Sequence, residues 1–364
     1  MAGVTRETLI ADFSRRFPGS VAPKLWRAPG RINLIGEHTD YNLGFVMPMA
    51  IGFSTYVAAA PSLDGKLRAY SVNVDATREW TPGDLRRAGD WGDYVAGVAH
   101  FLGQYRPMNL YIHSEVPTGA GLSSSAALEL STALALLDGR KIAPLDLVRL
   151  CRRAENDFVG MPCGIMDQFI SALAVEHAAL RIDCRSLEYE VVVLPGDVAI
   201  VAVNSMVKHE LGNSAYRTRV AECAAAAEML GVASLRDATH DGGNKRARHI
   251  VSENVRVEAF RSACTKGDLR AMGELFVASH RSMQYDYEIS CAELDFLVDT
   301  AIALNGVFGS RMTGGGFGGC TVNLVAPDKV ASFERSITAA YEARYGITPR
   351  IYRSVPAGGA GVFE

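Results

Sequence analysis

Hydrophobic and polar residues follow two different periods on either side of one glycine-rich stretch of this chain. Before the stretch, Leu110, Ile112 and Val116 alternate with other residue types, and this period of two predicts a half-buried β-strand. After it, apolar residues recur at helical spacing from 126 to 137, and Gly139 stands where a helix would end. The pattern therefore predicts a strand, a glycine loop and a helix in direct succession.

The same two periods predict further elements in both halves of the chain. Residues 5–17 place apolar side chains on one helical face, which predicts a short amphipathic helix. Residues 53–60 and 67–73 look like strands, and the turn-forming residues 61–65 between them predict a hairpin. The other predicted elements are a helix over 91–105, a helix from Pro144 to Gly160, a buried strand over 198–203, helical segments up to residue 305 and a strand over 321–325.

The glycine-rich stretch, Pro117–Ala127, has two features of a phosphate-binding loop. Its glycines let the backbone approach a ligand closely. Its three serines, Ser123 to Ser125, stand at the predicted helix start, beside unpaired N–H groups and the positive end of the helix dipole. The loop lacks the Gly-Lys-Ser/Thr of a Walker motif. An ordinary capped turn remains the alternative, although one serine and one glycine would suffice for it.

A second stretch, Ala28–Asn42, places many polar groups within an apolar sequence, where unpaired polar groups cost free energy. One interpretation is an internal salt-bridge cluster around Arg31. Another is a polyhydroxylated ligand, because sugars need carboxylates and imidazoles as partners for several hydroxyls at once. A metal site is a third, although no second histidine stands at ligand spacing. The polar residues concerned are Arg31, Asn33, Glu37, His38 and Asp40.

A third stretch, Val159–Gln168, joins helix-breaking residues to a carboxylate. Pro162 and Gly164 are expected to end the preceding helix. Asp167 stands among apolar residues, where a lone carboxylate is usually a helix N-cap or half of an ion pair. It becomes a catalytic candidate only with an arginine partner and a substrate hydroxyl nearby. Cys163 is disfavoured as a nucleophile because no histidine stands locally to activate it.

A fourth stretch, Val307–Cys320, has five glycines around Phe317. One glycine-rich turn is weak evidence, but this is the second such loop in the chain, and Arg311 adjoins it. We expect it to pack against the first loop and to close a nucleotide site from another domain. The basic run 244–249 is interpreted as solvated surface.

Composition excludes several classes of protein. The formal net charge of −3 argues against a dedicated nucleic-acid binder, which needs a basic face. No stretch approaches the roughly 20 apolar residues of a membrane helix, and the first residues lack the pattern of a signal peptide. Seven cysteines without paired spacing favour a reduced, cytoplasmic protein without structural zinc.

Together, the four stretches resemble the galactokinases of the GHMP small-molecule kinase family, over about residues 20–356. Residues 117–127 and 313–319 resemble the two glycine motifs of the family, whereas 30–41 and 160–168 resemble galactokinases more narrowly. The resemblance implies a two-domain α+β fold. A ribosomal-protein-S5-domain-2-like mixed sheet with helices, expected over 1–196, would be joined to a ferredoxin-like C-terminal domain over 197–364, with the active site between them.

The resemblance also implies roles for individual residues. Asp167 would be the catalytic carboxylate, and Arg31 would stabilise the transition state. The sugar ligands would be Glu37, His38, Thr39, Asp40, Gly164 and Tyr216. The ATP ligands would be Ser71, Gly119, Ala120, Gly121, Leu122, Ser123, Ser124 and Ser125, with Ser125 and Glu155 on Mg²⁺.

The implied reaction is transfer of the γ-phosphoryl group of ATP to the anomeric hydroxyl of α-D-galactose, which asks mainly for positioning and charge stabilisation. A related kinase for N-acetylgalactosamine or arabinose is the first alternative, because the pocket wall that admits a substituent cannot be read from the sequence. A sugar- and ATP-dependent sensor without turnover is the second. We expect a monomer whose partners are galactose and ATP.

Overall fold

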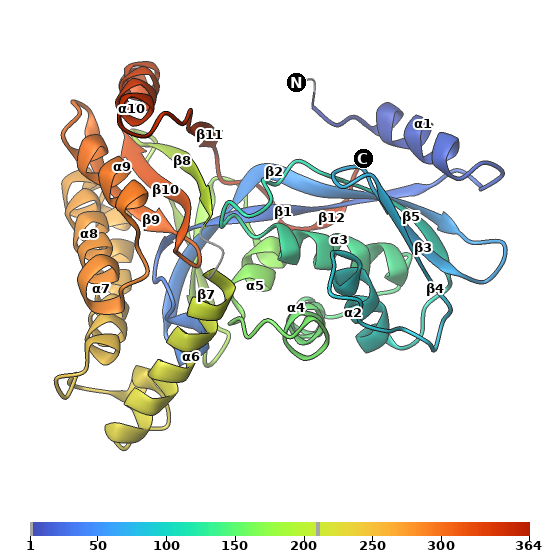
Figure 1. The fold of residues 1–364 in the computed structure, drawn as a ribbon, viewed down its shortest axis with the longest axis horizontal. Coiled ribbons are helices and arrows are strands. Elements are labelled where there is room, and N and C mark those ends of the chain that lie inside the picture. Colours follow the sequence, from blue (N-terminus) through green and yellow to red (C-terminus); the bar gives the residue numbers. More distant parts are fainter. Residues whose placement is uncertain (1–2, 209–211) are drawn as a thin grey trace.

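The chain folds into two β-sheets with helices packed against them (Figure 1). The computed structural model describes residues 3–208 and 212–364. Within that part, the larger sheet has eight strands, in the order β12-β1-β2-β5-β3-β4, with β6 paired to β2 and β7 to β6. The smaller sheet has four, in the order β11-β8-β10-β9. All strand pairs are antiparallel except β3 with β5, so the larger sheet is mixed, as predicted.

The strands are β1 (Lys24–Ile35), β2 (Phe45–Pro61), β3 (Leu67–Ser71), β4 (Ala76–Trp80), β5 (Met108–Ser114), β6 (Ala178–Asp183), β7 (Tyr189–Val193), β8 (Ala199–Lys208), β9 (Val307–Thr313), β10 (Gly318–Val325), β11 (Arg350–Ser354) and β12 (Gly361–Val362).

The α-helices are α1 (Arg6–Arg16), α2 (Gly92–Leu102), α3 (Ser124–Leu137), α4 (Pro144–Arg153), α5 (Met166–Leu173), α6 (Gly212–Met229), α7 (Lys245–Lys266), α8 (Leu269–Ser282), α9 (Ala292–Ile302) and α10 (Val330–Tyr345). Short 3₁₀ turns are η1 (Asp40–Asn42), η3 (Leu235–Asp237) and η5 (Pro327–Lys329), and π turns are η2 (Ala154–Val159) and η4 (Met283–Tyr287).

Strand β5 is buried on both faces, so the prediction of a half-buried strand is wrong. Helix α1 covers one face of the sheet, where Phe13 packs in a cluster with Tyr111 (Figure 1). Leu110 and Ile112 point to the other face and pack in the cluster formed with α2 and α3. A tyrosine can line a buried face as well as an exposed one, which is why alternation alone misjudged this strand.

The predicted hairpin over 53–73 is also wrong, although both of its strands exist. Strand β5 lies between β2 and β3, and Ala69 in β3 is paired in parallel with Leu110. The turn at 61–65 therefore joins two strands that are not neighbours. A strand that is distant in sequence has taken the central position, and local turn signals carry no information about such an insertion.

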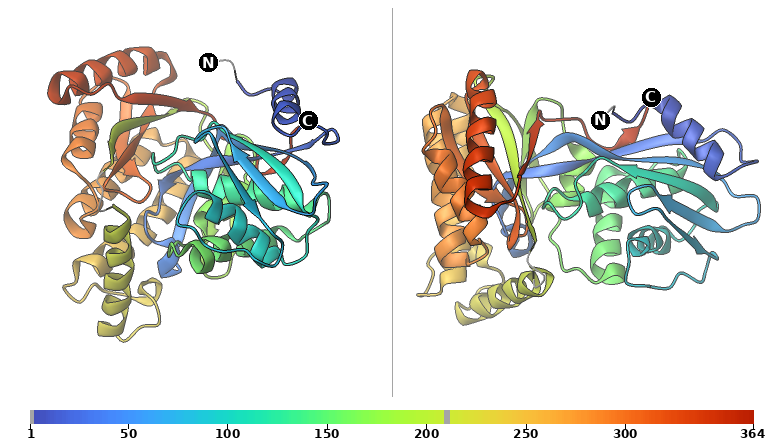
Figure 2. Two further views of the ribbon diagram at one scale, coloured as in Figure 1. Left: turned by 45° about the vertical axis from the view of Figure 1, so that its right-hand side comes forward. Right: turned by 45° about the horizontal axis from the view of Figure 1, so that its top comes forward.

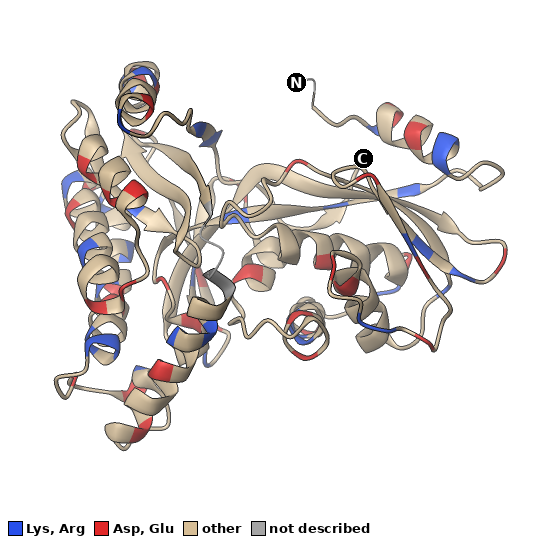
Figure 3. Cartoon of the chain, viewed as in Figure 1, with Lys and Arg blue, Asp and Glu red and all other residues tan. Residues whose placement is uncertain are grey.

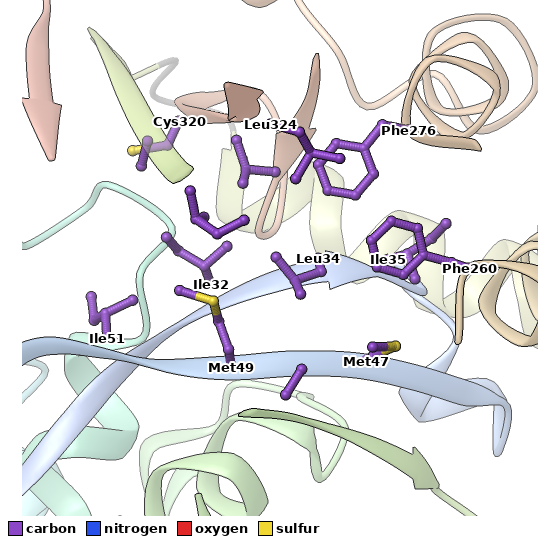
Figure 4. Close-up of a cluster of buried hydrophobic side chains, with 14 of the residues drawn as sticks. Ile32, Leu34, Ile35, Met47, Met49, Ile51, Phe260, Phe276, Cys320 and Leu324 are labelled. Atoms are coloured by element: carbon purple, nitrogen blue, oxygen red, sulfur yellow. The ribbon is translucent and has the colours of Figure 1, made fainter. Parts of the chain in front are cut away.

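One hydrophobic core joins the two sheets (Figure 4). It contains Ile32, Leu34 and Met49 from the larger sheet and Leu324 from the smaller one, together with Phe276 of α8. Helices α9 and α10 stand on the side of the smaller sheet that faces away from the larger one (Figure 2). The two sheets therefore pack against each other at the place where the predicted motifs meet. The domain boundary near residue 196 stays a prediction.

Opposite charges are interspersed along the helices beside the smaller sheet (Figure 3). In the basic run 244–249, Lys245 and Arg246 both pair with Glu288, and Arg248 pairs with Asp241. This run is therefore neutralised by carboxylates at the surface. In the described ranges, no helix has the length and apolar character needed to cross a membrane. All seven cysteines lie within those ranges, and none forms a disulfide.

Candidate active site

The four sequence motifs meet around one cavity of about 280 Å³ between the two sheets. The predicted site residues that line it are Arg31, Glu37, His38, Asp40, Gly119, Gly121, Leu122, Ser123, Ser124, Ser125, Glu155, Gly164, Asp167 and Tyr216. The second glycine loop, residues 314–319, lines it from the other side. Segments nearly 300 residues apart in sequence thus form one site.

The first glycine loop reaches this place through left-handed backbone conformations. Gly119 and Gly121 have φ of 73° and 75°, and Ser123 has φ of 59°. A Cβ atom on Gly314 would lie 2.8 Å from the carbonyl oxygen of Gly121, so the two loops touch backbone to backbone. The prediction that the loops pack together is confirmed. Ser124 opens α3, and the positive end of that helix faces the cavity.

Arg31 and Asp167 form a bidentate ion pair inside the cavity. Arg31 Nε donates to Asp167 Oδ1 at 2.9 Å, and Nη2 donates to Oδ2 at 3.0 Å. The arginine is buried, whereas the aspartate side chain stays 23% exposed toward the cavity. Ser123 Oγ also donates to Asp167 Oδ2. Ile165 is the N-cap of α5, so the N-cap alternative for Asp167 is wrong and its arginine partner is present.

The turn after β1 brings Asp40 against Gly164. A Cβ atom on Gly164 would lie only 2.0 Å from Asp40 Oδ2, so no larger residue fits there without moving the carboxylate. Burial, followed by the nearby charge of Asp167, raises the pKa of Asp40 to about 6. A carboxylate in this position can accept hydrogen bonds from a ligand in the cavity.

His38 joins this turn to the second glycine loop. Its Nε2 lies 3.3 Å from the carbonyl oxygen of Gly315, which can only accept, so Nε2 carries the hydrogen. Nδ1 therefore accepts from Tyr41 Oη at 2.7 Å. Burial lowers the pKa of His38 to about 3, so the ring is neutral near pH 7. The Tyr216 ring, from α6, lies 5.1 Å from the imidazole and completes this wall.

Glu37 is bound by both parts of the protein. Its Oε2 accepts from Arg311 at 2.7 Å and from Asn33 at 2.8 Å, and its Oε1 accepts from the Gly314 amide at 2.7 Å. Burial raises the pKa of Glu37, and the Arg311 charge opposes that shift. Arg311 is fully buried and also donates to the carbonyl oxygen of Leu34 at 2.6 Å. The sequence placed Arg311 beside the loop but gave no indication of this pairing.

Ser125 and Glu155 lie together where the first loop enters α3. Burial raises the pKa of Glu155, the charge of Asp167 adds to the rise, and a hydrogen bond from Ser125 works against it. A hydroxyl and a carboxylate are ligands that suit Mg²⁺. In the described part of the chain, no group of three or more acidic, histidine or cysteine residues could hold a metal by itself. The pair therefore fits an ion that takes its other ligands from water and phosphate, as Mg²⁺ commonly does.

Three predicted site residues do not line the cavity. Thr39 is fully buried, and its hydroxyl hydrogen is shared between the carbonyl oxygens of Gly36 and Phe45, so this side chain holds the shape of the turn. Ala120 is buried in the core that joins the sheets. Ser71 ends β3 and is buried outside the residues that line the cavity.

Two polar residues next to the site were missed at the level of sequence. Glu129 and Gln168 are fully buried and hydrogen-bonded to each other. A signal was available, because Glu129 interrupts the apolar run of the helix over 126–137.

Family models match most of the chain. Residues 11–61 match the galactokinase galactose-binding signature, residues 93–174 the N-terminal domain of GHMP kinases, and residues 260–343 their C-terminal domain. The chain is 44% identical to a galactokinase of Chloroflexus aurantiacus, over 98% of this chain and 96% of that one. It is 43% identical to a human galactokinase, over 97% and 96%.

Solved structures agree with these matches. The structure of Lactococcus lactis galactokinase complexed with galactose superimposes with a TM-score of 0.93 and 36% identity, covering 98% of this chain and 99% of that one. A mevalonate kinase superimposes with a TM-score of 0.68 at 16% identity, covering 91% of this chain and 98% of that one, which supports the shared fold alone. The predicted two-domain α+β GHMP kinase fold is confirmed.

Proposed function

The chain belongs to the galactokinases of the GHMP kinase family, and from this premise we propose how its residues transfer the γ-phosphoryl group of ATP to galactose. The anomeric hydroxyl of the α-sugar attacks phosphorus, the bond from phosphorus to the bridging oxygen of ADP breaks, and the hydroxyl loses its proton. Such a transfer depends mainly on positioning and on stabilising charge.

The triphosphate lies along Gly119–Ser125 in this proposal. The left-handed backbone conformations in this loop bring backbone N–H groups and the α3 N-terminus to the cavity, which favours binding of an anion there. The second glycine loop closes the opposite side. It can lie this close to the first loop because Gly314 has no side chain that would collide with Gly121. Ala120 acts through the backbone of the loop, and Ser71 is retained only as a predicted contact with the nucleotide.

The sugar lies against the turn that follows β1. Asp40, His38 and Tyr216 bind its hydroxyls and its ring face, with Gly164 leaving the space that Asp40 occupies. Glu37 lines the same cavity while it ties the turn to Arg311, so it can accept a further bond from a hydroxyl. Thr39 contributes by holding the turn.

Asp167 orients the attacking hydroxyl and takes its proton, and Arg31 stabilises charge that develops on the transferred group. The observation that carries this assignment is the bidentate pair between them, whose aspartate faces the cavity within reach of the first loop. Because the arginine is buried and fixed at three nitrogen atoms, two bonded to Asp167 and one to the Gly121 carbonyl oxygen, little reorganisation is needed when charge develops.

Ser125 and Glu155 would hold Mg²⁺. When bound, the ion would neutralise phosphate oxygens and bring the triphosphate into line with the hydroxyl. The support is the chemistry of the two side chains, the hydrogen bond between them, and the position of Ser125 at the start of α3. We also propose that the protein acts as a monomer in the cytoplasm, and the absence of disulfides among its seven cysteines is compatible with a reducing compartment.

A coupled assay of ADP release with a panel of sugars tests the proposal. Galactose should support turnover, whereas glucose, arabinose and the 2-acetamido analogue of galactose should support far less. Preference for another sugar would favour the related-kinase alternative. Binding of galactose and ATP without ADP release would favour a sensor.

A further inference from the structure

A buried amide links two carboxyl groups from different helices beside the cavity. Gln168, in α5, donates from Nε2 to Glu129 Oε2 at 3.0 Å and to Glu155 Oε2 at 2.6 Å. Glu129 comes from α3 and Glu155 from η2, so the amide connects three elements. Glu129 and Gln168 are fully buried, and Glu155 is 5% exposed. Only Glu155 lines the cavity.

The mechanism proposed above does not use Glu129 or Gln168, although burying them is costly. Glu129 Oε1 and Gln168 Oε1 have no hydrogen-bond partner among the residues that the structure describes. A core that served packing alone would place apolar side chains here, because buried polar groups cost free energy unless they are paired. This cost indicates that Glu129 and Gln168 have a function in the neighbouring site.

The direction of the bonds indicates that role. Gln168 donates to Oε2 of Glu155, and the Cys163 thiol, which lies 3.0 Å from Asn156 Oδ1, is 3.3 Å from the same carboxylate atom, so neither occupies Oε1. A side-chain amide has two N–H groups on one nitrogen and can serve one carboxyl group with each, without adding charge. It therefore fixes the rotation of the Glu155 carboxyl group by connecting it to Glu129.

We propose that Gln168, held in place by Glu129, is a positioning residue that orients Glu155 toward Mg²⁺. This inference rests on the proposed function, in which Glu155 is a ligand of the ion. Partners behind a metal ligand orient it, and replacing them typically lowers metal affinity by about 10- to 100-fold.

The test measures the gain in affinity for a fluorescent ADP analogue when Mg²⁺ is added. Gln168→Met keeps the length of the side chain and removes both N–H groups. We expect the Mg²⁺-dependent gain to fall by about 10- to 100-fold, with metal-free nucleotide affinity unchanged. Ser171→Ala is the matched control, because Ser171 lies in the same helix and its buried hydroxyl donates to the Pro29 carbonyl oxygen at 2.6 Å. This control should keep the gain.

A second pair of variants keeps the test decisive if Gln168→Met folds poorly. Glu129→Gln retains an acceptor for the Gln168 amide and should keep the gain within about threefold, whereas Glu129→Met removes the acceptor and should lose about tenfold or more. Retention of the full gain in Gln168→Met or in Glu129→Met would overturn the positioning role. If the unmodified protein shows no gain on adding Mg²⁺, the proposed metal role itself fails.

Discussion

Gly164 offers the sharpest test of the sugar side of the cavity, because the three atoms nearest to an added methyl group all belong to Asp40. In Gly164→Ala, the new Cβ would lie 2.0 Å from Asp40 Oδ2, 2.2 Å from its Cγ and 2.7 Å from its Cβ. Gly164 does not have the left-handed φ that would penalise alanine. The strain therefore falls on the Asp40 side chain, because the 3₁₀ turn that carries it is held by hydrogen bonds to the backbone carbonyl oxygens of Thr39 and Asp40.

The size of the effect follows from the bond that Asp40 would lose. A hydrogen bond to a charged group contributes about 1.5–3 kcal/mol. At about 1.4 kcal/mol for each factor of ten, losing it raises the galactose KM by about 10- to 150-fold. The ATP KM should change little, since the nucleotide loop does not touch Asp40 in this account.

Steady-state kinetics with each substrate varied in turn measure both constants, and thermal unfolding checks the fold. Gly52→Ala is the control, because a Cβ there meets no atom within 4 Å. A galactose KM within about twofold of the unmodified protein, in a folded Gly164→Ala variant, would refute the placement of Asp40 at the sugar.

Three further predictions concern the catalytic pair, the bond between the two sheets and the pH profile. Asp167→Asn should lower kcat by about 10²- to 10⁴-fold while nucleotide affinity, measured by titration, stays unchanged; near-normal kcat would rule out its role. Arg311→Met leaves the buried Glu37 carboxylate without the cation that neutralises it, so the free energy of unfolding from urea titration should fall by about 3–5 kcal/mol, and adding Glu37→Gln should recover part of it. A loss below about 1 kcal/mol would contradict that pairing. Because the pKa of Asp40 is raised from 3.8 to about 6, kcat/KM for galactose should fall by about tenfold per pH unit below that value, and a flat profile there would contradict an ionised Asp40 at the sugar. The free energy of unfolding should depend on pH in the opposite direction. The native state binds this proton more tightly than the unfolded state, so the contribution of Asp40 to the free energy of unfolding decreases as pH rises from about 4 to about 6.

Local sequence signals predicted well those elements that depend on residues close to one another in the chain. The α1 and α3 helices and the two glycine loops follow from periodicity and from residues with special backbone freedom. The failures concern contacts between distant segments. Strand β5 lies between β2 and β3, so the predicted hairpin does not form. Helix α1 packs on the second face of the sheet, so β5 is buried on both faces.

The site shows the same division. The motifs named the residues around the cavity, because each motif is short and rich in polar groups. They could not show which polar groups bind one another. Glu37 pairs with Arg311 across 274 positions of sequence, and Gln168 bonds to Glu129 across 39. Thr39 stands within the sugar motif yet bonds to backbone, so membership of a motif does not by itself define a ligand.

A crystal structure with galactose, a non-hydrolysable ATP analogue and Mg²⁺ would test the central claim most directly. The account predicts the anomeric hydroxyl within hydrogen-bond distance of Asp167, the terminal phosphate beside Arg31, and the triphosphate along Gly119–Ser125. A sugar whose anomeric carbon points away from Asp167, or a triphosphate bound away from that loop, would contradict it.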